Sequence, residues 1–130
     1  MSPTITVGLH GTAQMVVTSQ DTAIALRSGD VPVLATPRIV ALVEEATCEA
    51  LRGHIDPHQT TVGTSVDIAH RRPSPLGARV IAHAEVVSVE GQRVVFDVRA
   101  DHETAAGEVV PSIARGQITR VVVDRDSFAG

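Results

Sequence analysis

Three residues, Thr36, Glu44 and His70, combine a reactive side chain with a position that packing alone does not explain. Glu44 is the least expected of them. The stretch 35–52, ATPRIVALVEEATCEALR, has an apolar spacing that predicts a helix buried over most of its circumference. On a helical wheel Glu44 projects beside Cys48 and Val40, away from the polar stripe. Since burying an unpaired carboxylate costs several kcal/mol or forces protonation, Glu44 needs a partner, a chemical role, or a rim position with its head in solvent.

Thr36 lies at the predicted start of this helix. A Thr followed by Pro37 is typical of a helix N-terminus, with Thr36 as the N-cap, and Gly53 supplies the stop. The free N–H groups and the dipole at such an end favour developing negative charge, so the hydroxyl of Thr36 could support a reaction there. A plain capping role for Thr36 is the simpler interpretation.

His70 lies near the end of a predicted strand, 60–71, in which Val62, Val66 and Ile68 share its face. Its ring should therefore point at the layer that holds the helix. An imidazole whose ordinary pKa is near 6.5 suits acid–base or hydrogen-bonding work at neutral pH. The alternative is a hydrogen-bonded histidine in the core or at its rim.

The spacing of apolar residues in the elements that position these side chains changes at residue 60. It passes from a period of 3.6 residues, typical of a helix, to a period of 2, typical of strands. The earlier segments are a strand, a short helix, a loop, the long helix and a connector, at 12–18, 22–28, 29–34, 35–52 and 53–59. The later ones are four strands joined by turns, at 60–71, 78–89, 92–101 and 108–123, with Pro111 marking an edge or a bulge. This order predicts one α+β domain, residues 1–130, in which a sheet curls around one helix and gains cover by dimerisation.

Composition excludes several classes of function. The chain has 11 basic residues, all Arg, a net charge of −4, and only Phe96 and Phe128 as aromatics, which argues against binding of nucleic acid. It has neither an apolar run of about 18 residues nor a charged leader before an apolar segment, which predicts no membrane contact. The single Cys48, interpreted as a small core residue, fits a reducing compartment, so we expect a cytoplasmic protein.

Metal and cofactor motifs are equally sparse. His54 and His58 have an H-x3-H spacing, but Pro57 interrupts any helix there and no third ligand is evident. His10, His83 and His102 belong to no recognisable constellation. The glycines form neither phosphate loop nor dinucleotide fingerprint. We therefore predict no metal and no cofactor.

The order of elements and three segments resemble a known family. ATPRIVALVEEA (35–46), GTSVDIAHRRPSPLG (63–77) and GQITR (116–120) are similar to the corresponding segments of the fluoroacetyl-CoA thioesterase family, within the hotdog fold. The resemblance covers roughly residues 7–128. The positions that match the family pattern are Thr36, Glu44, Gly63, Thr64, His70 and Arg120.

The resemblance implies a curved antiparallel sheet of about five strands around one long central helix, and hydrolysis of a small or medium acyl-CoA thioester. Glu44 would be general base or nucleophile, and His70 an acid–base or hydrogen-bonding group, with Thr36 orienting Glu44 or the attacking group. Gly63 and Thr64 would lie along the substrate, and Arg120 would hold a carboxylate or close the pocket. Arg71 and Arg72 would meet CoA phosphates or form a solvated strand end.

Two departures and two alternatives accompany this interpretation. Loop 27–34 carries none of the phenylalanines of the family's lid, so the resemblance does not extend to fluoroacetyl selectivity, and Glu45 replaces an aromatic residue. A hotdog acyl-CoA hydratase or dehydratase is disfavoured, because such enzymes usually carry a His on the central-helix segment and none occurs between residues 34 and 52. A non-catalytic protein that binds acyl-CoA or another hydrophobic ligand stays open. We expect a homodimer, and the sequence leaves open whether dimers pair further.

Overall fold

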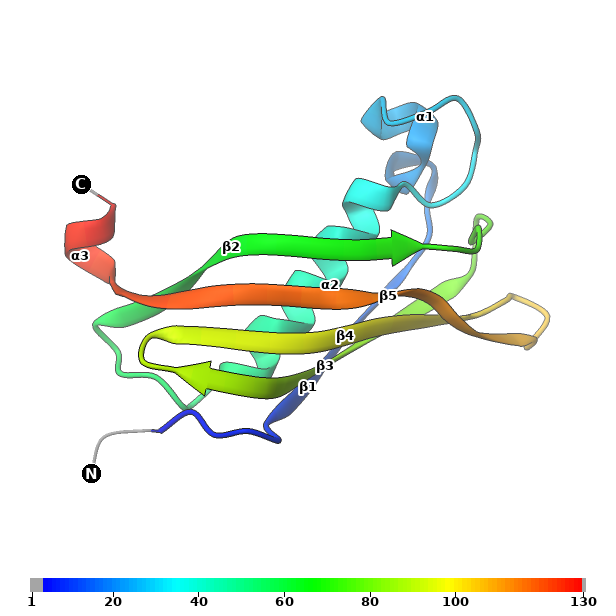
Figure 1. The fold of residues 1–130 in the computed structure, drawn as a ribbon. Helices are drawn as coiled ribbons and strands as arrows, with labels where there is room; N and C mark the ends of the chain where they lie inside the picture. Colours follow the sequence, from blue (N-terminus) through cyan, green and yellow to red (C-terminus); the bar gives the residue numbers. More distant parts are fainter. Residues whose placement is uncertain (1–3, 130) are drawn as a thin grey trace.

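The computed structural model describes residues 4–129 and contains one five-stranded sheet and one long helix (Figure 1). Its elements in chain order are β1 (His10–Val16), the 3-10 turn η1 (Ser19–Asp21), α1 (Ala23–Leu26), α2 (Thr36–Leu51), β2 (Gln59–His70), β3 (Arg79–Glu90), β4 (Arg93–Glu103), β5 (Val109–Asp124) and α3 (Arg125–Phe128). Every predicted strand is present, with each boundary within two residues of the expected one. The short α3, capped by the Asp124 carboxylate, was not predicted.

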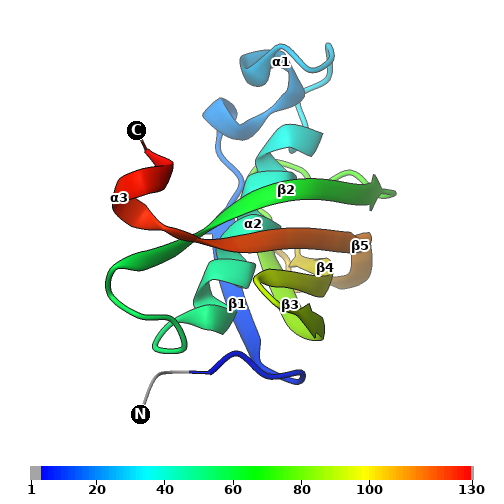
Figure 2. The same cartoon turned by 60° about the vertical axis from the view of Figure 1, so that its left-hand side comes forward.

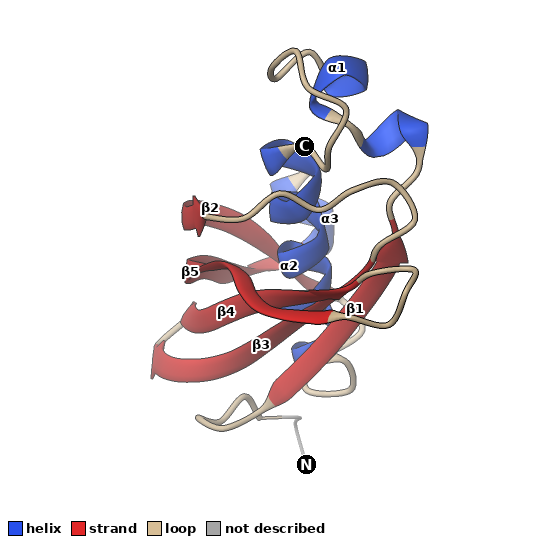
Figure 3. Ribbon diagram, turned by 90° about the vertical axis from the view of Figure 1, so that its right-hand side faces the viewer, coloured by secondary structure: helices blue, strands red, loops and turns tan. Residues whose placement is uncertain are grey.

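The sheet has the order β1-β3-β4-β5-β2, and all of its neighbouring strands are antiparallel. It curls around α2, which lies on the inner face (Figures 2 and 3). α1 and the loop that follows it extend beyond the N-terminal end of α2 (Figure 3). The α+β hotdog architecture, with a curved sheet around one central helix, is therefore confirmed.

Helix α2 begins one residue earlier than a cap at Thr36 would place it. Ala35 is the N-cap, Thr36 is already helical and Pro37 follows it in the first turn. The prediction that Thr36 caps the helix is wrong, because its hydroxyl is directed to β2 instead of to the first turn. The predicted stop is confirmed, since Gly53 adopts a φ of +81° just past the last helical turn.

The core forms where the apolar side of α2 meets the inner face of the sheet. The residues of α2 predicted to be apolar and buried are all fully or almost fully buried: Ile39, Leu42, Val43, Ala46 and Ala50. Gly11 of β1 packs directly on the helix, where a Cβ atom would meet the backbone of residues 46 and 50. Cys48 is exposed, so its assignment to the core is wrong; it lies between Glu44 and the polar stripe of α2.

Three irregularities in strand register adjust which side chains face the helix. In β2 the register shifts between Gly63 and Ser65, which leaves Thr64 as the extra residue. The prediction that Val62 shares a face with His70 is therefore wrong, and Gly63 takes the helix-facing side instead. The other two irregularities lie in β3, where the register shifts between Val86 and Ser88, and in β5, opposite β4, where Pro111 was predicted to mark an edge or a bulge.

Within residues 4–129, no helix is long and apolar enough to cross a membrane.

Candidate active site

Thr36 and His70 form a direct pair at the start of α2. Thr36 Oγ1 lies 2.8 Å from His70 Nδ1, although the residues are 34 positions apart in the chain. Burial lowers the pKa of His70 below its ordinary value of 6.5, which favours the neutral ring at pH 7. His70 Nε2 is buried and has no hydrogen-bond partner within residues 4–129. A hydroxyl bonded to a neutral imidazole that keeps one unused nitrogen is an arrangement able to move a proton.

Glu44 has a partner on β5. Arg120 Nη1 lies 3.4 Å from Glu44 Oε2, and the Glu44 side chain is 34% exposed. The almost buried Arg120 also donates to Thr61 through Nε to Oγ1 (2.8 Å) and through Nη2 to the main-chain oxygen (3.0 Å). The rigid guanidinium is thereby fixed by β2 and itself fixes one oxygen of the carboxylate. The other carboxylate oxygen, Oε1, makes no hydrogen bond within residues 4–129.

Gly63 provides the space in which the Glu44 carboxylate lies. A Cβ atom on residue 63 would lie 2.5 Å from Glu44 Oε2 and 3.6 Å from Arg120 Nη1. Gly63 and Arg120 are also register partners in the β2–β5 ladder. The carboxylate can lie here because residue 63 has no side chain, and the position has no unusual backbone angle that demands glycine.

The remaining predicted binding residues follow β2. Thr64 is exposed at the bulge, and its hydroxyl makes a long contact of 3.4 Å to the Thr119 carbonyl. Arg71 and Arg72 lie just beyond the end of β2 and line a depression of about 350 Å³ together with Thr36 and His70. Loop 28–34 forms the opposite wall of this depression. Both arginines are exposed, and neither side chain has a hydrogen bond or ion pair within residues 4–129.

The three predicted catalytic residues form two groups rather than one triad. Within residues 4–129, no hydrogen bond or ion pair joins Glu44 to Thr36 or His70. Thr36 and Glu44 are eight positions apart on α2, which corresponds to about 12 Å along the helix axis. The Thr36–His70 pair lies at the end of β2, and the Glu44–Arg120 pair lies beside Gly63 in the first half of the same strand. The outer edge of β2 pairs with no other strand within residues 4–129.

A family model for fluoroacetyl-CoA-specific thioesterases (FlK) matches residues 17–126. The chain belongs to this family. A curated relative, the fluoroacetyl-CoA thioesterase of Streptantibioticus cattleyicolor, is 31% identical over 96 residues. The match covers 74% of this chain and 65% of the relative, so the chain spans less than two thirds of the relative's length.

Solved structures agree with the family assignment. A structure of the fluoroacetyl-CoA thioesterase FlK is 27% identical with a TM-score of 0.81, over 96% of this chain and 93% of that one. A mutant of that enzyme in complex with fluoroacetate and CoA is also 27% identical, with a TM-score of 0.79 over 95% and 99% of the two chains. A Thermus thermophilus member of the thioesterase superfamily is 25% identical, with a TM-score of 0.82 over 96% and 88%.

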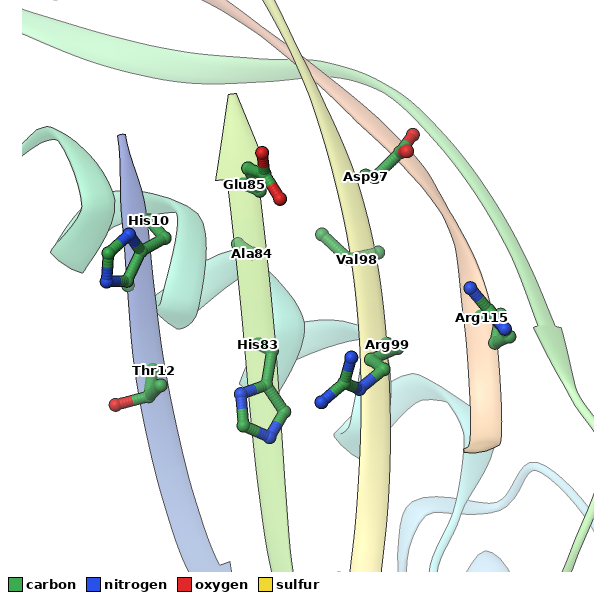
Figure 4. Close-up of a pocket in the computed structure, with 10 residues that line it drawn as sticks. His10, Thr12, His83, Ala84, Glu85, Asp97, Val98, Arg99 and Arg115 are labelled. Atoms are coloured by element: carbon green, nitrogen blue, oxygen red, sulfur yellow. The ribbon is translucent and has the colours of Figure 1, made fainter. Parts of the chain in front are cut away.

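A polar depression outside this region lies on the outer face of the sheet (Figure 4). It measures about 340 Å³, and His10, His83, Arg99 and Arg115 are among its lining residues. None of the predicted site residues lines it. Within residues 4–129, no group of three His, Cys, Asp or Glu side chains could hold a metal ion, and His54 instead contacts the Thr4 carbonyl.

One polar pair escaped the sequence analysis. His102 Nδ1 lies 2.6 Å from Ser74 Oγ, and both residues are buried. A signal was present in the sequence, because His102 continues the alternation of apolar residues along β4 toward the helix. The partner could not be read from the sequence, since it lies 28 residues away in an irregular connection.

Proposed function

We propose that this protein hydrolyses a small or medium acyl-CoA thioester to the free acid and CoA, with Thr36, Glu44 and His70 as its catalytic residues. The observation that carries the proposal is the Thr36–His70 hydrogen bond of 2.8 Å, on a ring whose buried Nε2 has no hydrogen-bond partner within residues 4–129. Membership of a thioesterase family supports the reaction class.

The reaction adds water to the thioester carbonyl and expels the CoA thiolate, which needs a base, a proton donor and support for the oxyanion. Glu44 suits the first role, as a general base toward water or as a nucleophile that forms a transient anhydride. His70 suits a proton relay: its lowered pKa favours the neutral ring, which can accept the proton released by the attacking water and then deliver that proton to the departing thiolate. Thr36 holds that ring at the N-terminus of α2, whose dipole favours the developing negative charge.

The remaining residues take supporting roles in this proposal. Arg120 is committed to Thr61 and Glu44, so the carboxylate that it holds is that of Glu44 rather than one on the substrate. Gly63 and Thr64 border the edge of β2, along which the thioester could approach. Arg71 and Arg72 are free to meet the phosphates of CoA beside the depression at His70.

A second copy of this chain is the partner that the sheet favours. Within residues 4–129, β2 pairs with β5 and has no neighbour on its other side, and Val66 within it is 44% exposed. An unpaired, partly apolar edge strand is stabilised when another strand continues the sheet. A homodimer joined through β2 would also cover the region between the two groups of catalytic residues. We further expect a cytoplasmic enzyme that needs no cofactor besides its CoA substrate.

The test is release of free thiol from a panel of acyl-CoAs, from acetyl to palmitoyl and including aryl and carboxylated acyl groups. Glu44→Gln and His70→Ala should each lower turnover at least about tenfold. Glu45→Gln is the matched control, because Glu45 is the exposed neighbour on α2 and has no polar contact to the site. Wild-type rates in both site variants would refute the assignment.

The same panel separates hydrolysis from simple binding. Loop 28–34, which walls the depression at His70, contains no aromatic side chain, and this is the one feature that favours a ligand-binding role. Binding of acyl-CoA without thiol release from any member of the panel would replace the hydrolase proposal by the binding protein.

A further inference from the structure

Ser74 and His102 form a buried polar pair that the proposed reaction does not use. Ser74 is 0% exposed and His102 is 3% exposed, so neither side chain can reach a substrate. Their hydrogen bond of 2.6 Å joins the connection between β2 and β3 to the inner face of β4. A buried hydrogen-bonding group that loses its partner is unfavourable, so this hydrogen bond holds its two segments in one arrangement.

The position of His102 shows why this ring needs a partner. Along β4 the inward-facing residues are buried and apolar up to the point where the row ends in His102: Val94, Phe96, Val98 and Ala100. Burial lowers the pKa of His102 below its ordinary value, which favours a neutral ring at pH 7. The Ser74 hydroxyl forms a hydrogen bond with Nδ1 of His102. An apolar side chain at residue 102 would fill the same position without needing such a partner.

Ser74 is connected to both members of the Thr36–His70 pair. Its carbonyl accepts a hydrogen bond from the Leu34 N–H (3.0 Å), two residues before Thr36. Along the chain it follows His70 by four residues. The Thr36–His70 bond, residues 70–74, the Ser74–Leu34 bond and residues 34–36 therefore form a closed ring of contacts.

His102 anchors this ring to the sheet. Pro73 and Pro75 flank Ser74 and restrict its backbone, so a shift of Ser74 is passed to its neighbours rather than absorbed. The other anchors of the segment are main-chain contacts, from the N–H groups of residues 71 and 72 to the Ile113 carbonyl. The Ser74–His102 hydrogen bond is thus the side-chain contact that sets the distance between this ring of contacts and β4.

We propose that Ser74 and His102 are positioning residues, which hold Thr36 and His70 at hydrogen-bonding distance for thioester hydrolysis. The expected effect on the rate rests on the proposed function. The expected effect on the surroundings of His70 does not depend on any activity. Loss of the Ser74–His102 hydrogen bond lets the ring of contacts relax. A displacement of a catalytic group by about 1 Å can lower a rate by up to about 100-fold.

The kinetic test compares Ser74→Ala and His102→Leu with wild type. We expect kcat to fall at least about tenfold with KM changed less than about twofold, because the tie acts on catalytic geometry rather than on substrate binding. His102→Asn should restore most of the rate, since its amide can place a hydrogen-bonding atom near the position of Nδ1. Val86→Ala is the stability control, because it opens a cavity at a buried residue of β3 that pairs with Phe96 and is not a member of the ring of contacts.

A double-variant cycle separates positioning from general destabilisation. In a His70→Ala background, Ser74→Ala should cause no further loss of the residual turnover, because the pair that it positions is already absent. An equal proportional loss in both backgrounds, or the same loss of kcat in Val86→Ala at matched melting temperature, would overturn the proposal.

A second measurement does not depend on activity. The ring of His70, followed by NMR during a pH titration, should titrate closer to its ordinary value in Ser74→Ala than in wild type, because the relaxed ring of contacts lets water reach the imidazole. An unchanged titration in Ser74→Ala would overturn the positioning role even if the protein proves to be a thioesterase. A changed titration in a protein without turnover would keep the positioning role and reject the proposed function.

Discussion

The space that Gly63 leaves for Glu44 allows a quantitative test of the candidate site. A Cβ atom at residue 63 would lie 2.5 Å from Glu44 Oε2, whereas ordinary van der Waals contact begins near 3.4 Å. In Gly63→Ala the carboxylate must therefore move by the difference, about 0.9 Å. Because a misplacement near 1 Å can cost on the order of 100-fold in rate, we expect kcat for thioester hydrolysis to fall by about that factor.

The same substitution should leave stability almost unchanged. The atom that must move is the end of a flexible side chain, and Gly63 does not have a positive φ that only glycine tolerates. Arg120 keeps both contacts to Thr61 when the carboxylate shifts. The melting temperature should therefore stay within about 3 °C of wild type, the change that corresponds to less than about 1 kcal/mol for a domain of this size.

Thiol release and thermal melting would be measured on Gly63→Ala, on Ser65→Ala as an exposed control in the same strand, and on Gly63→Ala combined with Glu44→Gln. The double variant should be no slower than Glu44→Gln alone, because both changes act on one carboxylate. A wild-type rate in Gly63→Ala would refute the reasoning. A further 100-fold loss in the double variant would show that residue 63 acts on the substrate directly rather than through Glu44.

Other predictions concern stability and assembly. Thermal stability should fall as the pH is lowered below 6.5, because the unfolded chain gains protons at His70 and His102 that the folded chain, with its lowered pKa values, does not. The contribution of the two histidines to stability is complete above pH 6.5. His102→Asn should make the dependence of the melting temperature on pH less steep. Gly11→Ala should lower the free energy of unfolding in urea by about 3 kcal/mol, since its Cβ would overlap the backbone of α2. Arg120→Lys should lower it by about 2 kcal/mol, because lysine lacks the fork that bonds Thr61, and a wild-type urea midpoint would contradict this. Sedimentation at micromolar concentration should show a dimer, and a monomer would refute pairing through β2.

The fold could be predicted because its signals are local and periodic. The change from a 3.6-residue to a 2-residue period locates the end of α2 and the start of β2 within a connector of a few residues. Glycines at the turns fix the hairpins, as Gly91 does between β3 and β4 with a φ of +60°. Tertiary contacts were not needed to find any of these elements.

The errors arose where one residue changes the pattern or where a distant partner competes. Thr64 adds one residue to β2, which reverses the faces of every residue before it, and nothing in the composition of that strand marks a bulge. Thr36 has a sequence typical of an N-cap, but His70 offers its hydroxyl a bond across 34 residues. Local capping rules could not weigh that competitor.

In the candidate site, too, the local signal could be read from the sequence and the distant partner could not. The sequence identified Glu44 as an acid out of place on its helix, and a physical rule was enough for that. It could not supply the compensating charge, because Arg120 lies 76 residues later on a strand that reaches Glu44 only when the sheet curls. The misplaced acid was thus both a structural problem with a solution on β5 and a candidate reactive group.

The separation of the two groups of catalytic residues places a constraint on how the proposed enzyme works. Thr36 and His70 meet at one end of β2, and Glu44 meets Gly63 toward the other. A thioester that engages both groups must therefore lie along β2, on the side where the strand has no neighbour. Because the same edge is where a second copy would pair, assembly and substrate binding have to be compatible on one strand. The bulge at Thr64 lies between the two groups, and it is the feature that turns both Gly63 and His70 toward the helix.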